Sequence, residues 1–254
     1  MSLEQETIEN YQGLFQHLRS KLESEEFLRQ HRRSERDFTR KRSLTFIIVV
    51  LFLLNMVKRA LQDELDEFFR VIQQQGKVAE RVVTKSAFTQ ARQKLKYTAF
   101  VELNQEQVAY FYGHYTPLRW CDFRLLAIDG SMSDVPNVPN LRDHFGVWSS
   151  ATSTGCAKAR LSQLFDVLDK VTVDACIGPN GQGERVLAEQ HLSQIGEGDL
   201  LLIDRGYPAY WFFRAIIARG AHFCGRLNVG KWKIVKRFVA SGQQEQIVTL
   251  KPDY

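Results

Sequence analysis

The pattern of hydrophobic and polar residues divides the chain into two parts. In residues 1–118 apolar positions recur every three or four residues, as Leu14, Leu18 and Leu22 do, and this spacing predicts helices. From residue 119 onward short apolar runs alternate with turn signals and amphipathic segments, as in proteins that combine strands with helices. We therefore expect an all-helical region over 1–118, followed by an α/β region.

The longest apolar run of the first part is LTFIIVVLFLLNMV, residues 44–57. A helix that crosses a membrane needs about 20 apolar residues, so we interpret this run as a buried helix of a soluble protein, with a membrane-associated helix as the alternative. The helix is expected to continue as an amphipathic segment through Leu65, Phe68 and Ile72 and to end near Gly76.

The segment TKSAFTQARQKLKY, residues 84–97, has the composition of a helix that reads DNA. Ser86 can cap this helix, and Phe88, Ala91 and Leu95 form its apolar stripe. A short helix, a turn and a helix rich in Gln, Lys and Arg make up a helix-turn-helix, although a solvated amphipathic helix has the same pattern. The cations selected here as DNA contacts are Lys85, Arg92, Lys94 and Lys96.

The second part has a recognisable order of elements. The apolar runs predict strands over 123–128, 159–168 and 171–177, a helix over 184–195, a strand over 200–203, a helix over 208–219 and a strand over 221–227. Three strands followed by alternating helices and strands is the order of the ribonuclease H-like fold, whose first and fourth strands are neighbours in a mixed sheet. Residues 119–228 are therefore predicted to form a ribonuclease H-like core.

Two of these strands end on an aspartate that has a glycine close behind it. The run 125–128 leads into Asp129, and the run 200–203 leads into Asp204. If the first and fourth strands are neighbours, the two aspartates leave strand ends about 4.8 Å apart. The alternative is that each aspartate only turns the chain.

Two carboxylates at that separation repel each other, so one must be protonated or both must bind a cation. Oxygen ligands on loops suit Mg²⁺ or Mn²⁺, and such a site supports phosphoryl transfer. Gly130 and Gly206 would leave room for a phosphate backbone to approach. Asp129 and Asp204 are therefore the candidate catalytic and metal-binding residues.

Composition agrees with a nucleic-acid partner but does not require one. The formal net charge is +5 and the isoelectric point is about 9.0, which is mildly basic. The four cysteines are far apart, so no zinc site or disulfide framework is expected. Together with a first segment that does not resemble a signal peptide, this favours the cytoplasm.

Other chemistries have little support in the sequence. The stretch DGSMSD, residues 129–134, does not fit the Gly-x-Ser-x-Gly pattern of serine hydrolases. The six histidines are scattered, and we interpret His144 and His191 as structural or surface residues.

Several blocks of the sequence resemble the DDE transposases of bacterial insertion sequences, specifically the insertion-sequence-four family. These blocks are RLLAIDGSMSDVPNVPNLRDHFG, ARLSQLFDVLDKVTVDACIG, GERVLAEQHL and GDLLLIDRGYPAYWFFRAI. The helical region also resembles the same family, in RKRSLTFIIVVLFLLNMVKRALQDELDEFF and KSAFTQARQKL. The resemblance runs nearly end to end.

The resemblance implies an enzyme that cuts double-stranded DNA at the terminal inverted repeats of a mobile element and joins the ends to target DNA. It implies two divalent metal ions, Mg²⁺ or Mn²⁺, and places the first two acidic residues of the family at Asp129 and Asp204. It also implies that residues 1–118 bind element ends, and that the protein acts at the nucleoid, with a second copy or a full-length transposase as a possible partner. From charge and position we add Lys158, Arg160 and Arg205 as phosphate contacts.

One departure from the family concerns its third acid, a glutamate on a helix beyond a β-rich insert. Residues 229–254 are expected to begin that insert, and the chain ends there. The nearby glutamates do not occupy the family's position: Glu184, Glu189 and Glu245. We therefore expect DNA cleavage to be lost or impaired. The alternative function is a non-catalytic DNA-binding chain that inhibits or partners the full-length transposase.

Overall fold

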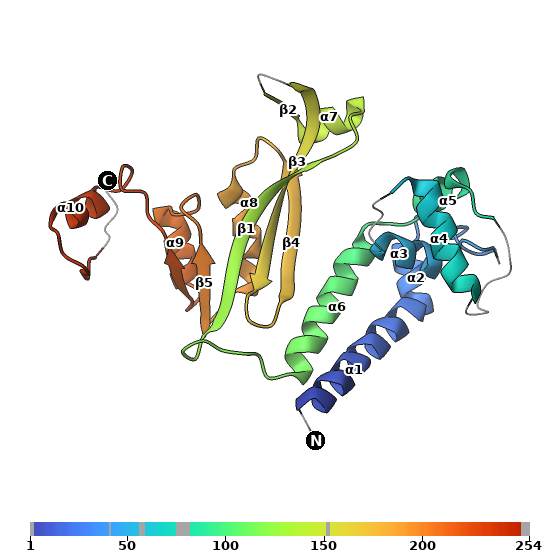
Figure 1. Ribbon diagram of the computed structural model, residues 1–254, viewed down its shortest axis with the longest axis horizontal. Helices are drawn as coiled ribbons and strands as arrows, with labels where there is room; N and C mark the ends of the chain where they lie inside the picture. Colours follow the sequence, from blue (N-terminus) through green and yellow to red (C-terminus); the bar gives the residue numbers. More distant parts are fainter. Residues whose placement is uncertain (1–2, 41, 56–58, 75–81, 151–152, 250–254) are drawn as a thin grey trace. The chain divides into compact units, whose positions relative to one another are not determined.

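The structure is a computed structural model that describes residues 3–40, 42–55, 59–74, 82–150 and 153–249. It divides into two compact units, Met1–Gly113 and His114–Tyr254, and each is described by itself. The first unit is helical and the second contains a mixed sheet with helices (Figure 1).

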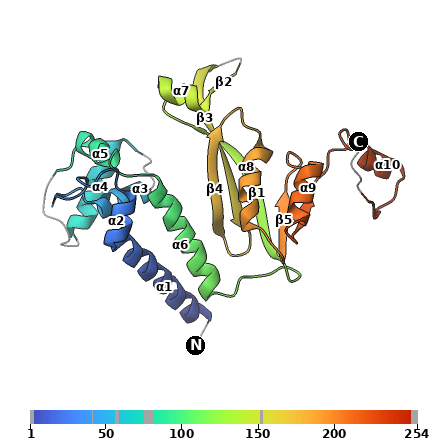
Figure 2. The ribbon, with the colours of Figure 1, turned by 180° about the vertical axis from the view of Figure 1, so that it is seen from behind.

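The helices of the first unit are α1 (Leu3–Glu23), α2 (Glu25–His31), α3 (Phe46–Leu54), α4 (Leu61–Gln74), α5 (Lys85–Arg92) and α6 (Thr98–His114). The long helices α1 and α6 lie side by side, and the shorter α3, α4 and α5 gather near one end of this pair (Figures 1 and 2).

The apolar run at 44–57 supplies the core of the first unit. Phe46, Val49, Val50 and Phe52 of α3 are buried, and the ring centroid of Phe52 lies 4.5 Å from that of Phe88 on α5, with the rings edge to face. Among the described residues there is no helix with the length and apolar character that a membrane crossing requires. The interpretation of this run as a buried helix is confirmed.

The expected single helix from residue 44 to Gly76 is wrong, because α3 ends at Leu54 and α4 begins at Leu61. Asn55 ends α3: its backbone N–H donates to the carbonyl oxygens of Leu51 and Phe52, and Asn favours caps over helix interiors. The end expected near Gly76 lies outside the described residues.

The cap of α5 also differs from the prediction. The hydroxyl of Thr84, not that of Ser86, accepts the hydrogen bond from the Ala87 backbone N–H, at 3.2 Å. Both residue types can cap a helix, so the pattern alone did not place the first turn. The predicted burial of Phe88 and Ala91 is confirmed.

A charged network joins α1 to α6. The Lys21 ammonium lies 2.7 Å from the Glu102 carboxylate and 2.9 Å from the Glu106 carboxylate, and the buried His31 contacts the other Glu102 oxygen at 2.8 Å. The hydrogen bonds from Lys21 hold the pKa of both glutamates below the usual range. These carboxylates therefore stay charged in the folded chain and attach α6 to α1.

The second unit is built on a six-stranded sheet. Its strands are β1 (Arg124–Asp134), β2 (Val147–Ser150), β3 (Ser153–Asp166), β4 (Val171–Pro179), β5 (Asp199–Ile203) and β6 (His222–Gly225). The order is β2-β3-β1-β5-β6, with β4 also pairing with β3. β3 is antiparallel to β1, β2 and β4, whereas β1 with β5 and β5 with β6 are parallel pairs.

The expected neighbourhood of the first and fourth predicted strands is confirmed, since these are β1 and β5. The predicted helices at 184–195 and 208–219 are α8 (Glu184–Gln190) with a 3₁₀ turn (His191–Gln194), and α9 (Tyr210–Ile217). α8 contacts β3 and β4 and covers one face of the sheet (Figure 2).

The sequence did not predict α7 (Pro139–Phe145) or β2. Both lie where the ribbon formed by β1 and β3 continues beyond the rest of the sheet (Figure 1).

The expectation of a β-rich segment over 229–254 is wrong for the described residues, which form a helix, α10 (Lys233–Ala240), and no strand beyond β6. Apolar residues recur at helical spacing, with Ile234, Val235 and Phe238 on one side. The Trp232 ring before α10 stacks on Phe213 of α9, with centroids 5.7 Å apart.

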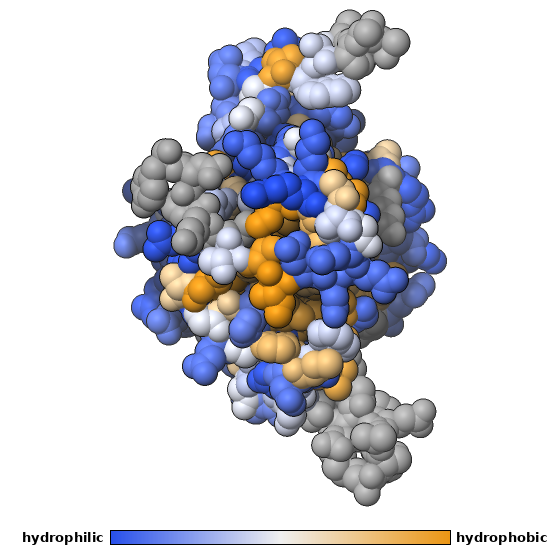
Figure 3. All heavy atoms as spheres, turned by 90° about the vertical axis from the view of Figure 1, so that its left-hand side faces the viewer, coloured by the Kyte–Doolittle hydropathy of each residue, from blue (hydrophilic) through white to orange (hydrophobic). Residues whose placement is uncertain are grey.

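The surface on the side that carries the C-terminal part of the chain shows apolar side chains gathered among polar ones (Figure 3). The large apolar side chains exposed in that part of the chain are Trp211, Ile217, Val229, Val239, Ile247 and Val248.

Replacing Lys21 by Met is expected to lower the free energy of unfolding by about 2 kcal/mol at neutral pH, because two partly buried carboxylates lose their cation. Both glutamate pKa values are lowered by folding, so this stabilisation is complete above the unfolded value of about 4.3 and is lost as the pH falls through the folded values. Urea unfolding followed by the helical circular dichroism signal, at neutral pH and at pH about 3, measures both effects.

The matched control for Lys21 is Arg19→Met on the same helix, whose ion pair with Glu23 is exposed and should be worth less than about 1 kcal/mol. A loss for Lys21→Met that is equal at both pH values would contradict the role assigned to the charged network.

Candidate functional site

The candidate site lies where the pairing of β1 with β5 stops. In the parallel register Leu126 is opposite Leu201 and Ile128 is opposite Ile203, and all four side chains are buried. Asp129 and Asp204 are the next residues along each chain, and both are exposed. The sheet therefore brings the two predicted aspartates to neighbouring positions.

One detail of the prediction is wrong: Asp129 does not end its strand. β1 continues to Asp134 because it remains paired with β3, where Asp129 lies opposite Gln163. Only the pairing with β5 ends here, since Asp204 is the first residue after that strand. Asp129 is thus fixed by a strand, and Asp204 by the loop that follows one.

Both aspartates accept hydrogen bonds from nearby backbone or side-chain groups. The Asp129 carboxylate accepts from the Gly130 backbone N–H at 2.8 Å. Asp204 accepts from the Arg205 backbone N–H and, at 3.3 Å, from the Arg226 guanidinium, and these bonds hold its pKa below the usual value. An exposed and ionised carboxylate at this position is available to a cation.

The glycines next to the aspartates face protein groups and not open space. A Cβ at residue 130 would lie 3.1 Å from the Tyr207 hydroxyl, and a Cβ at residue 206 would lie 3.2 Å from a Glu184 carboxylate oxygen. Such approaches are closer than ordinary van der Waals contact. The expectation that these glycines make room for a phosphate is therefore replaced by a different role: they admit Tyr207 and Glu184.

Tyr207 is 2% exposed, and its hydroxyl has no hydrogen-bond partner within the described part of the chain. Burial raises the pKa of Tyr207, and the negative charges of Glu184, Asp129 and Asp204 raise it further. The hydroxyl is thus a neutral donor next to the carboxylates.

Glu184 is bound by Arg160 of β3, with 2.6 Å between the guanidinium and the carboxylate. Two other nitrogens of Arg160 donate to the Asn180 carbonyl oxygen at 3.3 and 3.4 Å. The arginine predicted to contact phosphate therefore has protein partners in this state. The sequence analysis set Glu184 aside as a third acid, because nothing in its spacing from Asp204 shows that α8 carries it to this point.

The other two cations predicted for this unit differ in their surroundings. The Lys158 ammonium lies 3.1 Å from Asp134 and 4.8 Å from the centroid of the Trp148 ring, whereas Arg205 is exposed. No group of three or more His, Cys, Asp or Glu side chains in the described ranges is placed to hold a metal ion. The metal and phosphate contacts remain predictions.

A Ser-His-Asp arrangement occurs elsewhere in the unit. His191 contacts Asp174 at 2.7 Å through Nδ1 and Ser162 at 3.0 Å through Nε2, which is the order of groups in serine hydrolases. Ser162 and His191 are 3% and 0% exposed, so no substrate reaches the hydroxyl. The expectation that His191 is structural is confirmed: it ties the end of α8 to β3 and β4.

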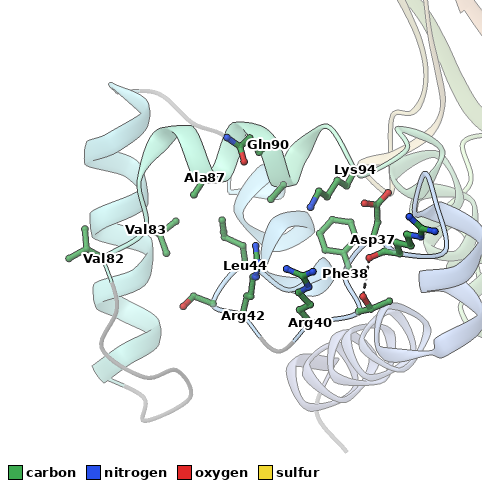
Figure 4. Close-up of a pocket in the computed structure, with 14 residues that line it drawn as sticks. Asp37, Phe38, Arg40, Arg42, Leu44, Val82, Val83, Ala87, Gln90 and Lys94 are labelled. Atoms are coloured by element: carbon green, nitrogen blue, oxygen red, sulfur yellow. Dashed lines mark hydrogen bonds between the residues drawn. The ribbon is translucent and has the colours of Figure 1, made fainter.

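The first unit has a pocket of about 550 Å³ between the 36–44 loop and α5. Its floor includes Phe38, Leu44 and Val83, and Figure 4 shows Arg42 and Leu44 pointing from the loop toward Ala87. The cations that line it are Arg36, Arg40, Arg42 and Lys94. Asp37 also lines the pocket, and its carboxylate accepts hydrogen bonds from Ser34, so the lining cations outnumber the one acid.

Of the four cations predicted in this unit, only Lys94 lines that pocket. Lys85 and Arg92 are exposed at the two ends of α5. The Lys96 ammonium donates to the Gln30 carbonyl oxygen at 2.9 Å. The other pocket cations are Arg36, Arg40 and Arg42, which precede α3.

Sequence comparison relates the chain to bacterial transposases. It is 33% identical over 136 residues to InsZ of Escherichia coli (strain K12), whose name assigns it provisionally as a transposase, covering 51% of this chain and 44% of that protein. It is 25% identical over 170 residues to transposase InsG for insertion sequence element IS4 of the same strain, covering 66% of this chain and 38% of that protein. No family model matches.

Among solved structures, the piggyBac transposase synaptic complex with hairpin DNA aligns with 78% of this chain and 41% of that chain, at a TM-score of 0.38 and 12% identity.

The chain is related to the transposases of bacterial insertion sequences. More particularly, its resemblance to the insertion-sequence-four type is confirmed by the IS4 relative. The chain matches less than half the length of either curated relative.

Replacing Gly130 by Ala is expected to destabilise the chain by about 1–3 kcal/mol, because the new Cβ meets Tyr207, Leu161 and Glu184 within 3.5 Å. Combining it with Tyr207→Phe should cost less than the sum of the two single changes, since the hydroxyl is the closest obstacle. Chemical unfolding of the three variants measures this coupling. Gly181→Ala is the control, as its Cβ would meet nothing within 4 Å, and additive effects would contradict the contact.

Proposed function

We propose that the chain acts in DNA transposition, with a ribonuclease H-like core that cuts and joins DNA by metal-dependent phosphoryl transfer. The observation that carries this proposal is the parallel pairing of β1 with β5, which sets Asp129 and Asp204 side by side. The relationship to named transposases supports the same reaction class.

The residues at this position fit a divalent cation such as Mg²⁺ or Mn²⁺. Asp129 and Asp204 offer exposed carboxylate oxygens, which hard cations prefer, and the orphaned Tyr207 hydroxyl indicates a missing polar partner. When bound, such a cation lowers the pKa of an attacking water or hydroxyl and offsets charge on the leaving oxygen. The protein's own contribution is to fix both carboxylates and to offer Arg205 to the DNA backbone.

The first unit is proposed to bind the DNA. Phosphate contacts by Lys and Arg supply most of the affinity of such proteins for DNA, and the pocket beside α5 presents four cations around an apolar floor. Double-stranded DNA with the terminal inverted repeats of the element is the proposed partner, and target DNA is the second substrate.

A second function is a non-catalytic DNA-binding chain that inhibits or partners a full-length transposase. Two observations favour it: within the described residues no three acidic side chains are placed to hold a metal ion, and Glu184 is bound by Arg160.

A labelled inverted-repeat duplex incubated with Mn²⁺ tests catalysis. Wild-type chain is expected to give weak nicking that falls by at least about 100-fold in Asp129→Asn and in Asp204→Asn, while DNA binding is retained. Asp134→Asn, on the same strand but paired with Lys158, is the control and should cut normally. A salt-sensitive gel shift without any cutting in wild type would support the non-catalytic function.

Replacing Arg40 and Arg42 by Ala is expected to weaken DNA binding and to reduce the slope of log affinity against log salt by about 1 for each cation removed. Fluorescence anisotropy over a salt series measures the slope. Arg70→Ala, which removes an exposed cation paired with Glu67 on α4, is the matched control. An unchanged slope in the pocket variant would place the DNA elsewhere.

A further inference from the structure

The pocket beside α5 is concave and small, which limits what it can hold. Its volume is about 550 Å³, within the range of about 300–1,000 Å³ that small-molecule sites have. A DNA duplex is read by an element that enters its groove, as a recognition helix does, whereas a pocket receives a group that enters the protein. The pocket therefore fits a ligand the size of one nucleotide.

Phe38 gives this pocket an aromatic surface in a constrained position. Its backbone φ is +60°, a left-handed conformation that a bulky residue rarely adopts, and such strain clusters at ligand-binding sites. Its ring lies edge to face against the buried Phe46, with the ring centroids 5.5 Å apart. Phe38 is thus held against the core while it lines the pocket, as a stacking surface for a nucleic-acid base requires.

Cations reach the same space from two sides. Figure 4 shows Arg40 and Arg42 extending from the 36–44 loop, and Lys94 extending from α5, toward the pocket. The lining also includes one acid, Asp37, whose Oδ2 accepts hydrogen bonds from the backbone N–H and the hydroxyl of Ser34. The excess of positive charge favours an anionic ligand, and guanidinium groups match the oxygens of a phosphate.

The two walls of the pocket are joined by backbone hydrogen bonds. The Arg33 backbone N–H donates to the Lys94 carbonyl oxygen at 2.9 Å, and Arg32 forms an antiparallel bridge with Leu95. The chain that leads into the 36–44 loop is therefore attached to the end of α5. Because these bonds do not involve a ligand, the pocket is formed before a ligand binds, as ligand sites usually are.

We propose that this pocket binds one unpaired nucleotide, with its base on the Phe38 ring and its phosphate among Arg40, Arg42 and Lys94. Gln90 of α5 also lines the pocket, and its amide can donate and accept hydrogen bonds at the edge of a base. This inference rests on the proposed function, because it takes the first unit to bind DNA. The nucleotide comes from an unpaired position in a DNA strand or from a free nucleoside monophosphate, which share this chemistry.

Fluorescence anisotropy of the full chain with three labelled DNA duplexes tests the inference. One duplex is blunt, the second carries a single unpaired nucleotide with a 5′-phosphate at its end, and the third carries an abasic residue at that position. The abasic duplex keeps the phosphate and lacks only the base. Wild type is expected to bind the unpaired nucleotide about tenfold more tightly than the abasic residue, and equal affinities for these two duplexes would overturn the inference.

Phe38→Ala is expected to abolish this tenfold preference and to leave the affinity for the abasic duplex unchanged. Phe38→Leu keeps apolar volume against Phe46, so it serves if the alanine variant does not fold, and it should lose most of the preference as well. Phe15→Ala removes an exposed ring of the same unit and is the matched control, which should behave like wild type. A preference that survives both changes at Phe38 would overturn the assignment of the base to this pocket.

Arg42→Gln separates the phosphate from the base. It should weaken binding of the unpaired-nucleotide and abasic duplexes by the same factor, because both carry the phosphate, and a loss confined to one of them would contradict the assigned phosphate position. Competition with free dAMP identifies the source of the ligand. Displacement of the labelled duplex supports a free nucleotide, and a retained preference without displacement supports a nucleotide within a DNA strand.

The same measurements distinguish failure of this inference from failure of the proposed function. If the unpaired-nucleotide and abasic duplexes bind alike, while replacing Arg40 and Arg42 by Ala weakens binding of all three duplexes, only the nucleotide inference fails. If wild type binds none of the three duplexes, the proposed binding of DNA by the first unit fails as well.

Discussion

The parallel pairing of β1 with β5 is the constraint on which the candidate site depends. Its register is fixed by burial, since Leu126, Ile128, Leu201 and Ile203 fill one face of the sheet. A shift of one residue in either strand would turn these apolar side chains out of the core and reverse the face of everything beyond them. The same burial that stabilises the sheet therefore places two aspartates, distant in the sequence, next to each other.

Two glycines near this pair allow polar side chains to approach the backbone closely. Gly130 and Gly206 leave the space that the Tyr207 hydroxyl and the Glu184 carboxylate occupy, and the backbone carbonyl of Gly206 also accepts a hydrogen bond from Arg185 at 3.0 Å. α8 is thereby tied by its first turn to the loop that carries Asp204. The position of that loop and the position of Glu184 are coupled through packing and not through neighbouring strands.

Sequence reasoning reached the parts of this arrangement that depend on apolar periodicity. The strand order and the neighbourhood of Asp129 and Asp204 follow from buried runs in a known order of elements. The position of Glu184 beside the aspartates could not be predicted from the sequence, because it depends on how α8 packs on β3. The end of α3 before Asn55 was not predicted for a related reason. The sequence stays apolar after Asn55, at Met56 and Val57, although α3 ends at Leu54.

Charge balance explains how a group of carboxylates can serve a polyanionic substrate. Asp129, Asp204 and Glu184 would repel a phosphate, but the cations that adjoin them are as numerous: Arg160, Arg205 and Arg226. As it stands the site is near neutral, so DNA meets no strong barrier. A divalent cation bound by the carboxylates would offset their negative charge. The net charge of the site would then be positive, and the site would attract phosphate only when the cation is bound.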